Sequence, residues 1–332
     1  MIEIKAIISS PDGLKTDISE VVGGVNLSGS IKESTRTLSF KALRADVDKN
    51  FKAYNLNLGD TAVFYEIKEG KPIKFFEGVT WSKATKDNSV GLDITCYDRA
   101  IYLNKNEPKD QVFTDKSADE VARAIITDLG LTPGDLAKTG KYSYNLRGLT
   151  AYDAIMAAYT KDSEKTGKQY KLVDIDGVIN VFEAGEEHPV ILEELDEPVV
   201  GKLLDVSYKE SLDELVNEVK AIEDKKKDEK KEAGKDSESQ ERFGKIQKIL
   251  KGDSSGVAGL MKGAKTEIDV TCIGDWDMVA GKSIELKSSI ISGKFYIEAD
   301  SHRLDDAVHI VDLKLTSELE MDKKGESSGK TG

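Results

Sequence analysis

The sequence predicts a mainly β fold in which two similar β units flank a small α+β insertion. Two observations support this. Segments that alternate apolar and polar residues, as half-buried strands do, occur in the same order near both ends of the chain. Between them the apolar spacing changes to that of helices. The matched segments begin at Thr37, Gly59, Lys74 and Leu92 near the N-terminus and at Glu267, Gly281, Lys294 and Ile310 near the C-terminus.

The offsets between matched residues drift slowly, as small changes in loop length would produce. They are 222 for Gly59 and Gly281, 220 for Lys74 and Lys294, and 219 for Leu92 and Val311. A rival match between residues 92–98 and 268–274 keeps a constant offset of 176 and makes Cys96 equivalent to Cys272. This rival match pairs the last strand of the first β unit with the first strand of the second β unit. Because short alternating patterns arise in many strands, we favour the alignment that preserves strand order.

The first β unit is expected over residues 1–106. An opening strand at Ile2–Ile8 leads into a turn at Pro11–Gly13, and Gly23 and Gly24 mark a turn or bulge. Several short strands with frequent turns favour a barrel or a sandwich. The remaining predicted strands are Arg36–Leu43, Thr61–Ile67, Ile73–Thr80 and Val90–Tyr97, with a hairpin turn at Gly70–Pro72.

The α+β insertion is expected over residues 107–195. Ser117–Glu120 has the pattern of a capping box, and the helix it starts should end at Gly130. A second helix is predicted at Asp153–Lys161, with its aromatic and methionine stripe in the core. The strands Gln169–Val173 and Val178–Phe182 should form a hairpin around the turn sequence Asp-Ile-Asp-Gly at 174–177.

The second β unit is expected over residues 196–320, beginning with a strand at Val199–Tyr208. Leu215–Ile222 fits either a capped helix or a strand, and we favour a strand. Fifteen of the twenty residues in Glu223–Arg242 are charged, which predicts a mobile loop or exposed helix. Short helices are predicted at Lys245–Leu250 and Val257–Lys262. The polar residues 321–332 are expected to form a disordered tail.

Composition excludes several functional classes. The net charge of −13 argues against a general nucleic-acid binder, because neutralising phosphates requires clustered cations. There is no run of eighteen apolar residues, and Glu3 and Lys5 interrupt any N-terminal hydrophobic region, so we expect neither a membrane span nor a secretory signal. Cys96 and Cys272 lie in strand patterns and are expected to be reduced core residues, although a disulfide between them stays open.

Two short motifs resemble the end of a phosphate-binding loop, but neither has the required glycines. Ala280–Ser283 has Trp276 where the first glycine should stand, and Ser328–Thr331 fails in the same way. The Asp-Ile-Asp-Gly sequence at 174–177 is too short for a calcium loop and is expected to be only a turn. With 61 acidic residues, no pair of carboxylates stands out as glycosidase-like.

The three histidines, His188, His302 and His309, have no partner at the spacing of a zinc site. A dyad of Cys96 or Cys272 with His309 stays open, but neither cysteine lies at a helix N-terminus or in a basic environment. The sequence therefore predicts no catalytic, cofactor-binding or metal-binding residues.

The order of elements, together with several segments, resembles the hub proteins of contractile phage-tail baseplates. The resemblance is to the XkdQ/YqbQ type of defective prophages and phage-tail-like bacteriocins, which is related to the gene-D-type tail hub proteins. It covers most of the chain and is strongest from about 200 to 318. The segments that carry it are Leu212–Val219, Arg242–Gln247, Gly281–Leu286, Gly293–His302 and His309–Leu315.

The resemblance implies a tail-hub architecture of two β-barrel units per chain and a homotrimeric ring. Three chains would then present six barrels to a sixfold tail tube and a threefold face to the spike. Expected partners are tail tube and tube-initiator proteins, the spike protein and baseplate wedge proteins. The protein would assemble in the bacterial cytoplasm and then belong to the released tail or tail-like particle. Lys294–Ala299 is expected to be an edge strand that a neighbouring barrel covers.

We expect no enzymatic activity. Two alternatives stay open, a tail-associated cell-wall hydrolase and a peptidoglycan-binding adaptor. An enzyme would need polar side chains that converge in a cleft, whereas a hub would need self-complementary edges for its ring.

Overall fold

The computed structural model describes residues 3–44, 54–87, 89–222, 230–251, 260–305 and 308–326. The chain divides into two compact units, one made of Met1–Val206 with Asp269–Gly332 and a smaller one of Ser207–Ile268. The larger unit contains the α+β insertion and most of both β units, and we call the smaller unit the arm. Two strands of the second β unit, Leu203–Ser211 and Lys265–Ile273, extend into the arm. None of the helices in the described ranges is long and apolar enough to cross a membrane.

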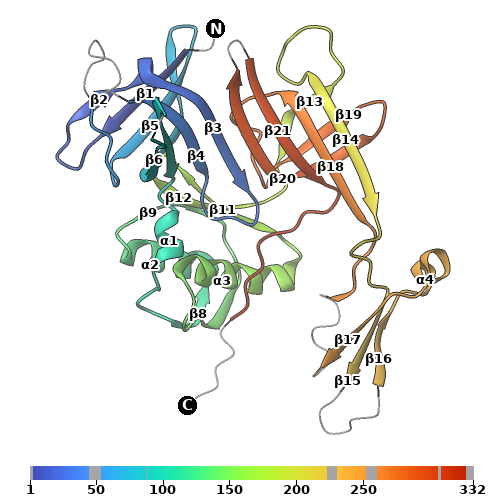
Figure 1. Ribbon diagram of the computed structural model, residues 1–332. Helices are drawn as coiled ribbons and strands as arrows, with labels where there is room; N and C mark the ends of the chain where they lie inside the picture. Colours follow the sequence, from blue (N-terminus) through green and yellow to red (C-terminus); the bar gives the residue numbers. More distant parts are fainter. Residues whose placement is uncertain are drawn as a thin grey trace. The chain divides into compact units, whose positions relative to one another are not determined.

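Both β units belong to one large sheet. Its strands follow the order β14-β18-β21-β20-β3-β4-β7-β6-β5-β1-β2, with β13 attached through β19 (Figure 1). The first β unit contains β1 (Glu3–Ser9), β2 (Lys15–Asp17), the 3-10 turn η1 (Ser19–Val21), β3 (Val22–Ser30), β4 (Thr37–Leu43), β5 (Thr61–Lys68), β6 (Lys71–Ala84) and β7 (Gly91–Tyr97). The second contains β13 (Glu187–Glu193), β14 (Leu203–Ser211), β18 (Lys265–Ile273), β19 (Ser283–Lys287), β20 (Ser292–Asp305) and β21 (Val308–Thr316).

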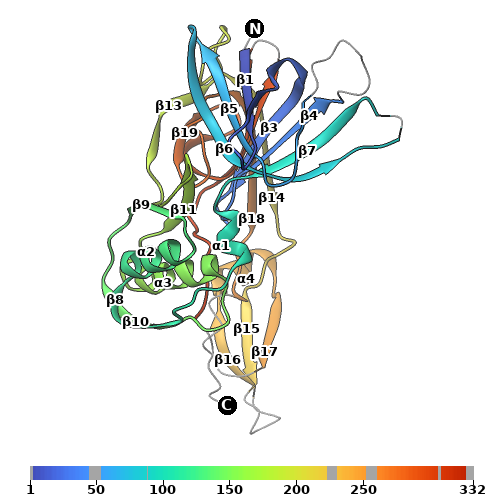
Figure 2. The same ribbon diagram turned by 90° about the vertical axis from the view of Figure 1, so that its left-hand side faces the viewer.

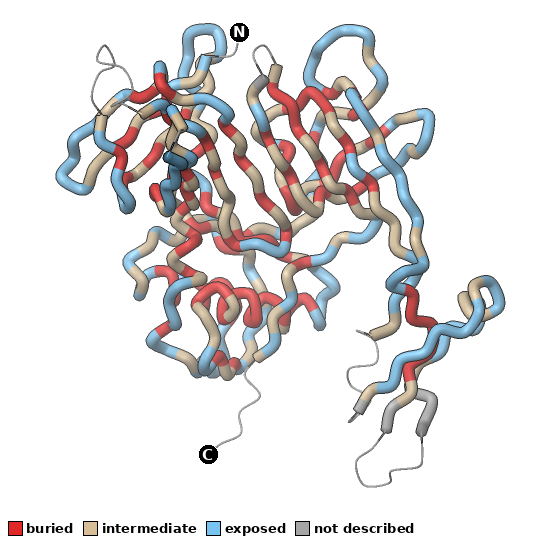
Figure 3. The backbone as a smooth tube through the Cα atoms, viewed as in Figure 1, coloured by how far each residue is buried: buried red, intermediate tan, exposed pale blue. Residues whose placement is uncertain are grey.

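The fold class predicted from the sequence, mainly β with an α+β insertion, is confirmed. Barrel closure is not seen in the strand pairings of the described residues, which follow an open path. Each β unit has its own apolar core, in which inward-facing side chains alternate with exposed ones along the strands (Figure 3). The largest fully buried side chains of the first β unit include Phe64, Leu38 and Ile94.

The predicted repeat is confirmed in strand order. The first β unit runs β3-β4-β7-β6-β5-β1 and the second runs β14-β18-β21-β20-β19-β13. The amide of Gly59 donates to the carbonyl of Thr80, and that of Gly281 donates to the carbonyl of Ile297, both at 2.9 Å. Matching register shifts follow Thr80 in β6 and Ile297 in β20. A bulge at the same place in both units is what a true repeat predicts.

The rival alignment is wrong, because Cys96 lies in β7 and Cys272 lies in β18, strands that are not equivalent. One matched pair needs correction. Val63 lies four residues after Gly59, and Glu285 lies four residues after the matched Gly281. Val63 pairs with Glu77 and Glu285 pairs with Lys294, so Glu77 rather than Lys74 is the equivalent of Lys294. The shift arises because β5 and β6 change register between Phe64 and Tyr65.

The two β units join through strands that are far apart in sequence. Strand β20 pairs antiparallel with β3, from Ala299 opposite Ser30 to Arg303 opposite Asn26, and Figure 1 shows these strands side by side. We call this pairing the β3–β20 joint. The expectation that Lys294–Ala299 needs cover from a neighbouring molecule is therefore wrong, because β19, β21 and β3 of the same chain pair with it.

The α+β insertion packs its helices against two small sheets. Its elements are α1 (Ile101–Lys105), β8 (Val112–Ser117), α2 (Ala118–Asp128), β9 (Thr132–Leu136), β10 (Lys141–Asn145), α3 (Ala151–Thr166), β11 (Tyr170–Ile175) and β12 (Val178–Glu183). The capping box at Ser117 and Glu120 is confirmed. Asp162 on α3 accepts hydrogen bonds from Tyr170 (2.6 Å) and Tyr142 (3.1 Å) and thereby ties α3 to β10 and β11. Figure 2 shows α1, directly after β7, beside α3.

The last described residues, 321–326, are not a disordered tail. Met321 is buried in the core of the α+β insertion, and the Tyr152 hydroxyl donates to Asp322 at 2.9 Å. The Lys324 amide donates to Thr160 Oγ1 at 3.1 Å. The segment after β21 therefore straps the second β unit to α3. The polar composition of this segment did not predict its order, because only one apolar residue, Met321, anchors it in the core.

The arm corrects two further predictions. Its elements are β15 (Glu218–Ile222), β16 (Lys230–Lys235), α4 (Ser237–Phe243) and β17 (Gln247–Lys251). Within the charged stretch Glu223–Arg242, β16 and most of α4 are ordered elements, and the part at 223–229 lies outside the described residues. The predicted helix at Lys245–Leu250 is instead strand β17, paired parallel to β15. The first half of the predicted helix at Val257–Lys262, residues 257–259, lies outside the described residues.

The arm folds this way because two neighbouring polar residues organise it. Asn217 donates to the carbonyl of Gly244 at 2.7 Å and accepts from the amide of Ile246 at 2.8 Å, which directs the chain from α4 into β17. Glu218 accepts from Lys245 at 2.8 Å and from Gln240 at 3.1 Å. Such long-range side-chain contacts leave no periodic signal in the sequence.

We predict that Met321→Ala lowers the free energy of unfolding by about 2–5 kcal/mol, because it opens a cavity in the core of the insertion. Lys323→Ala, an exposed neighbour, serves as the control and should cost less than about 0.5 kcal/mol. Urea denaturation measures both. Equally small effects would show that the strap contributes nothing to stability.

Candidate functional site at the junction of the modules

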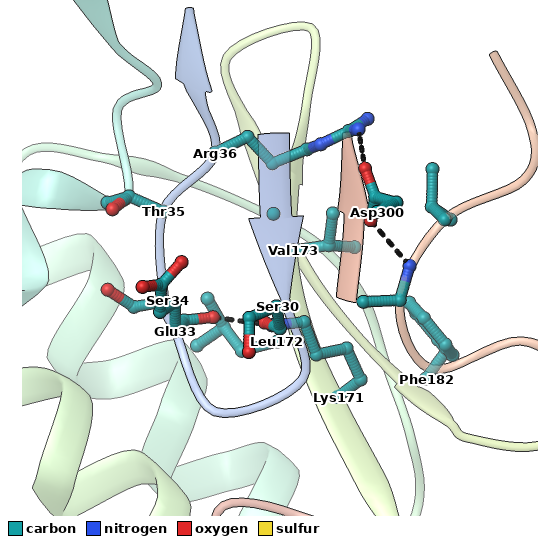
Figure 4. Close-up of a pocket in the computed structure, with 13 residues that line it drawn as sticks. Ser30, Glu33, Ser34, Thr35, Arg36, Lys171, Leu172, Val173, Phe182 and Asp300 are labelled. Atoms are coloured by element: carbon teal, nitrogen blue, oxygen red, sulfur yellow. Dashed lines mark hydrogen bonds and ion pairs between the residues drawn. The ribbon is translucent and has the colours of Figure 1, made fainter. Parts of the chain in front are cut away.

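The centre of the β3–β20 joint is a buried ion pair. Arg36, just before β4, pairs through its guanidinium with Asp300 on β20, whose side chain is only 1% exposed (Figure 4). Asp300 also accepts a hydrogen bond from the Ala280 amide at 2.7 Å. Burial opposes the charge, but Arg36 and His302 hold the pKa of Asp300 below its ordinary value. A Cβ atom at Gly29 would lie 3.2 Å from Arg36 Nε, so a glycine gives the pair its room.

An aromatic stack lies beside the ion pair. The ring of Trp276 stacks on Phe75 of β6, with centroids 3.9 Å apart, and contacts His309 at 4.0 Å. Its indole N–H donates to Glu66 of β5 at 2.8 Å. The indole thus links the second β unit to the first. In the sequence, Trp276 drew attention only because it stands where a phosphate-binding loop requires its first glycine. Tryptophan is enriched at contact surfaces, so a tryptophan between two predicted strands could have indicated this contact.

His302 and His309 form a pair behind this stack. The Nδ1 atom of His302 lies 3.0 Å from Nε2 of His309, and its Nε2 lies 3.1 Å from Asp300 but is poorly aligned for a hydrogen bond. Burial lowers the pKa of His302 and that of His309, the latter to about 3. Both rings are therefore neutral and shielded from water, which suits packing and does not suit proton transfer to a substrate.

Three further buried ionisable side chains fasten the α+β insertion to the first β unit. Lys171 of β11 donates to the carbonyls of Ser30 (2.6 Å) and Glu33, and burial lowers its pKa to about 8 (Figure 4). Asp98, directly after β7, accepts from the amides of Arg36 (2.7 Å) and Ala100 (3.0 Å). Burial, with Asp174 nearby, raises the pKa of Asp98 to about 8.

Asp174 is held in the same manner. It accepts from the amides of Arg99 at 2.8 Å and Gly177 at 2.7 Å, and burial raises its pKa to about 6. The predicted turn at 174–177 is confirmed, with φ of 57° at Asp176 and 81° at Gly177. Asp174 thus stabilises the hairpin turn through Gly177 and connects this hairpin to Arg99, the residue after Asp98.

Two cavities open at this junction. The smaller, about 40 Å³, lies around Arg36, Lys171 and Asp300 (Figure 4). The larger is a cleft of about 490 Å³ whose lining includes Lys74 and Glu77. Lys74 pairs with Glu77 at 2.9 Å and with Asp176 at 3.0 Å. The described residues contain no group of three or more His, Cys, Asp or Glu side chains placed to hold a metal ion.

The remaining sequence candidates occupy structural positions. Both cysteines are free and buried, and burial raises the pKa of each thiol to about 12. Cys96 faces Thr80 at 3.8 Å and Cys272 faces Met278 at 4.0 Å, so the dyad with His309 does not form. His188 is buried against Asp275 at 3.2 Å. Ala280–Ser283 leads into strand β19 rather than into a helix, unlike a phosphate-binding loop.

These groups hold structural elements together. Each buried charge at the junction is engaged by backbone amides, by carbonyls or by another buried charge. The fold and the junction define a chain with two like β units, locked edge to edge and clamped by an α+β insertion.

A family model described as YQBQ-like matches residues 25–316, and the chain belongs to this YQBQ-like family. The fold is similar to that of the 43 kDa tail protein of prophage MuSo2 from Shewanella oneidensis, with a TM-score of 0.68 and 11% identity over 94% of this chain and 97% of that one. It is also similar to a tail protein of Neisseria meningitidis MC58 (TM-score 0.59, 13% identity, 95% and 96% covered).

A further similar structure is the prophage tail protein gp18 of Listeria monocytogenes EGD-e (TM-score 0.55, 10% identity, 95% of each chain covered). At such low identities the likeness concerns the fold alone. A comparison with curated protein sequences finds no significant match.

We predict that Asp98→Asn changes how stability depends on pH. Since folding raises the pKa of Asp98 to about 8, its contribution to stability is fully present below about pH 4 and is lost as the pH rises through 8. The asparagine does not titrate. The unfolding free energy of the variant relative to wild type should therefore rise between pH 4 and 8, by at most about 1.4 kcal/mol per pH unit.

Urea denaturation of both proteins across this range measures the difference, in which the contributions of the histidines cancel. A difference that stays constant with pH would show that Asp98 is ionised in the folded protein throughout the range.

Proposed function

We propose that the protein is the structural hub of a contractile injection system, in which three copies form a ring between a sixfold tail tube and a threefold spike. The observation that carries this proposal is the repeat of strand order within one chain. Two like β units per chain give a threefold ring six similar positions. The shared fold of prophage tail proteins and of a chain from a Francisella PdpA–VgrG complex (TM-score 0.55) supports the same role.

The repeat also suggests how copies join. Strand β3 pairs with β20 within the chain, but its equivalent, β14, stands at the free end of the sheet order. The equivalent of β20 is β6, which pairs with β5 only as far as Val79, and its last residues Ser82–Ala84 are exposed. Within the described residues, both strands of a second joint are thus present without being paired to each other. A head-to-tail joint of β14 with β6 of the next copy would close a ring.

The joint between copies would be weaker than the joint within the chain. The matched bulges make Lys83 the equivalent of Asp300, so the buried ion pair with arginine has no counterpart there. Lys83 instead donates to the carbonyl of Leu56 at 3.0 Å. A permanent joint inside each chain and a weaker joint between chains would let the spike or the tube control assembly.

The partners follow from this symmetry. The six β units would face tail tube and tube-initiator proteins, and the threefold face would receive the spike, with wedge proteins around the ring. The hub would assemble in the bacterial cytoplasm and remain in the released tail or tail-like particle. We propose no catalytic step, because the buried charges of the junction are engaged in holding the modules together.

We predict that Tyr208→Asp blocks assembly and leaves the single chain folded. Tyr208 is 39% exposed on β14, in the part of the strand that corresponds to the paired end of β3, so a charge there costs little in the monomer but would be buried in the joint between copies. Leu14→Asp, at an exposed turn of the first β unit, is the matched control. Sedimentation of each variant with the cognate spike and tube proteins measures copy number, and thermal unfolding verifies the fold.

Wild type and the control should give three copies, and Tyr208→Asp should give one. A wild-type particle with any other copy number contradicts the threefold hub. Three copies in the Tyr208→Asp variant would contradict the use of the β14 edge.

A further inference from the structure

The arm presents a basic edge strand with exposed isoleucines. Its sheet has the order β16-β15-β17, so one edge of β17 pairs with no other strand of the described residues. The segment Arg242–Lys251 contains one arginine, three lysines and no acidic residue. Ile249 is 46% exposed, and Ile246 and Lys248 are exposed as well. An edge strand that combines apolar and basic side chains is suited to pair with an acidic protein surface.

The arm holds this edge in place with very little core. In the described part of the arm the buried apolar side chains are Leu215, Val216, Val219 and Ile268, and Leu250, Leu260 and Met261 pack around Val216 and Val219. Three short strands with so small a core are marginally stable alone. The contacts of Asn217 and Glu218 described above nevertheless fix the start of β17. The position of the β17 edge is therefore determined by hydrogen bonds within the arm.

The position of the arm in the repeat indicates what lies near it. The arm connects β14 to β18, and the equivalent connection in the first β unit is the short turn from β3 to β4. That turn contacts β20 at the end of the β3–β20 joint, because the Ile31 amide donates to the Glu298 carbonyl at 2.8 Å and Lys32 pairs with Glu298 at 3.7 Å. If β14 joins the next copy as β3 joins β20, the arm begins where two copies meet.

Charge favours the next copy as the partner. Residues 207–268 carry fourteen basic and fourteen acidic residues, so the net charge of −13 lies entirely on the rest of the chain. A basic edge on a neutral arm is attracted to that acidic surface, whereas two acidic bodies repel each other.

We infer that the arm docks the β17 edge on the acidic surface of the neighbouring copy and thereby strengthens the joint between copies. This inference rests on the proposed ring. The arm would supply the attraction that the joint of β14 with β6 lacks, since no buried ion pair stands at Lys83.

The test compares self-association of the full chain with that of a Lys248→Glu/Ile249→Glu double variant. Both side chains are exposed, so the arm should still fold, and hydrogen exchange at the β15 amides verifies this. Lys235→Glu on β16, the opposite edge of the same sheet, is the matched control. Sedimentation equilibrium at two ionic strengths gives the dissociation constants.

We expect the double variant to associate at least about tenfold more weakly than wild type and to lose most of the salt dependence. The Lys235→Glu control should stay within about twofold of wild type. A second variant replaces residues 217–261 by a short Gly/Ser turn, which is feasible because Val216 and Lys262 exchange backbone hydrogen bonds of 2.9 and 3.1 Å. It should show the same weakening.

Two results would overturn the inference, and they differ. If wild type forms no three-copy ring even with the spike protein, the proposed function fails and the inference fails with it. If wild type forms the ring and both arm variants associate equally well, the ring stands and the docking of the arm is wrong. Loss of spike or tube binding alone, with unchanged association between copies, would likewise assign the edge to another partner.

Discussion

Pairing of β3 with β20 is the constraint on which the rest of the structure depends. Five residue pairs connect strands from opposite ends of the chain, and Asp300, which forms the buried ion pair with Arg36, belongs to the second of them. Asp98 binds the amide of Arg36, Trp276 spans the two units beside the pair, and Lys171 holds the turn after β3. The joint thus aligns the two β units and clamps the insertion against them.

A buried ion pair is a costly way to stabilise a joint, because both charges lose their hydration. Its clearest effect here is on register. A one-residue slip of β20 against β3 would move Asp300 away from Arg36 and turn the strand over, leaving an unpaired charge inside the sheet. Gly29 leaves room for the pair, and the bulge after Ile297 sets where the strand crosses from β19 to β3. Selecting one register in this way fixes how the two β units are aligned within the chain.

Local patterns in the sequence predicted much of the fold. Alternating strands gave the order of the repeat, the capping box gave the start of α2, and a turn sequence gave the hairpin at Asp174. The predictions from the sequence were wrong where contacts between residues far apart in the chain determine the structure. Asn217 and Glu218 make strands and a helix out of a charged stretch, Met321 anchors a polar strap, and β3 covers a strand expected to be an edge. The site itself was missed, because Arg36, Asp98, Trp276 and Asp300 share no spacing and meet only in the folded chain.

In the proposed ring, one kind of joint is repeated within and between chains. An electron cryo-microscopy reconstruction of the protein assembled with its spike would show whether this is so. We expect a ring of three chains in which β14 of each chain pairs antiparallel with β6 of the next, and this pair superposes on β3 with β20. A ring in which β14 is solvent-exposed, or in which the chains meet through the α+β insertions alone, would contradict it.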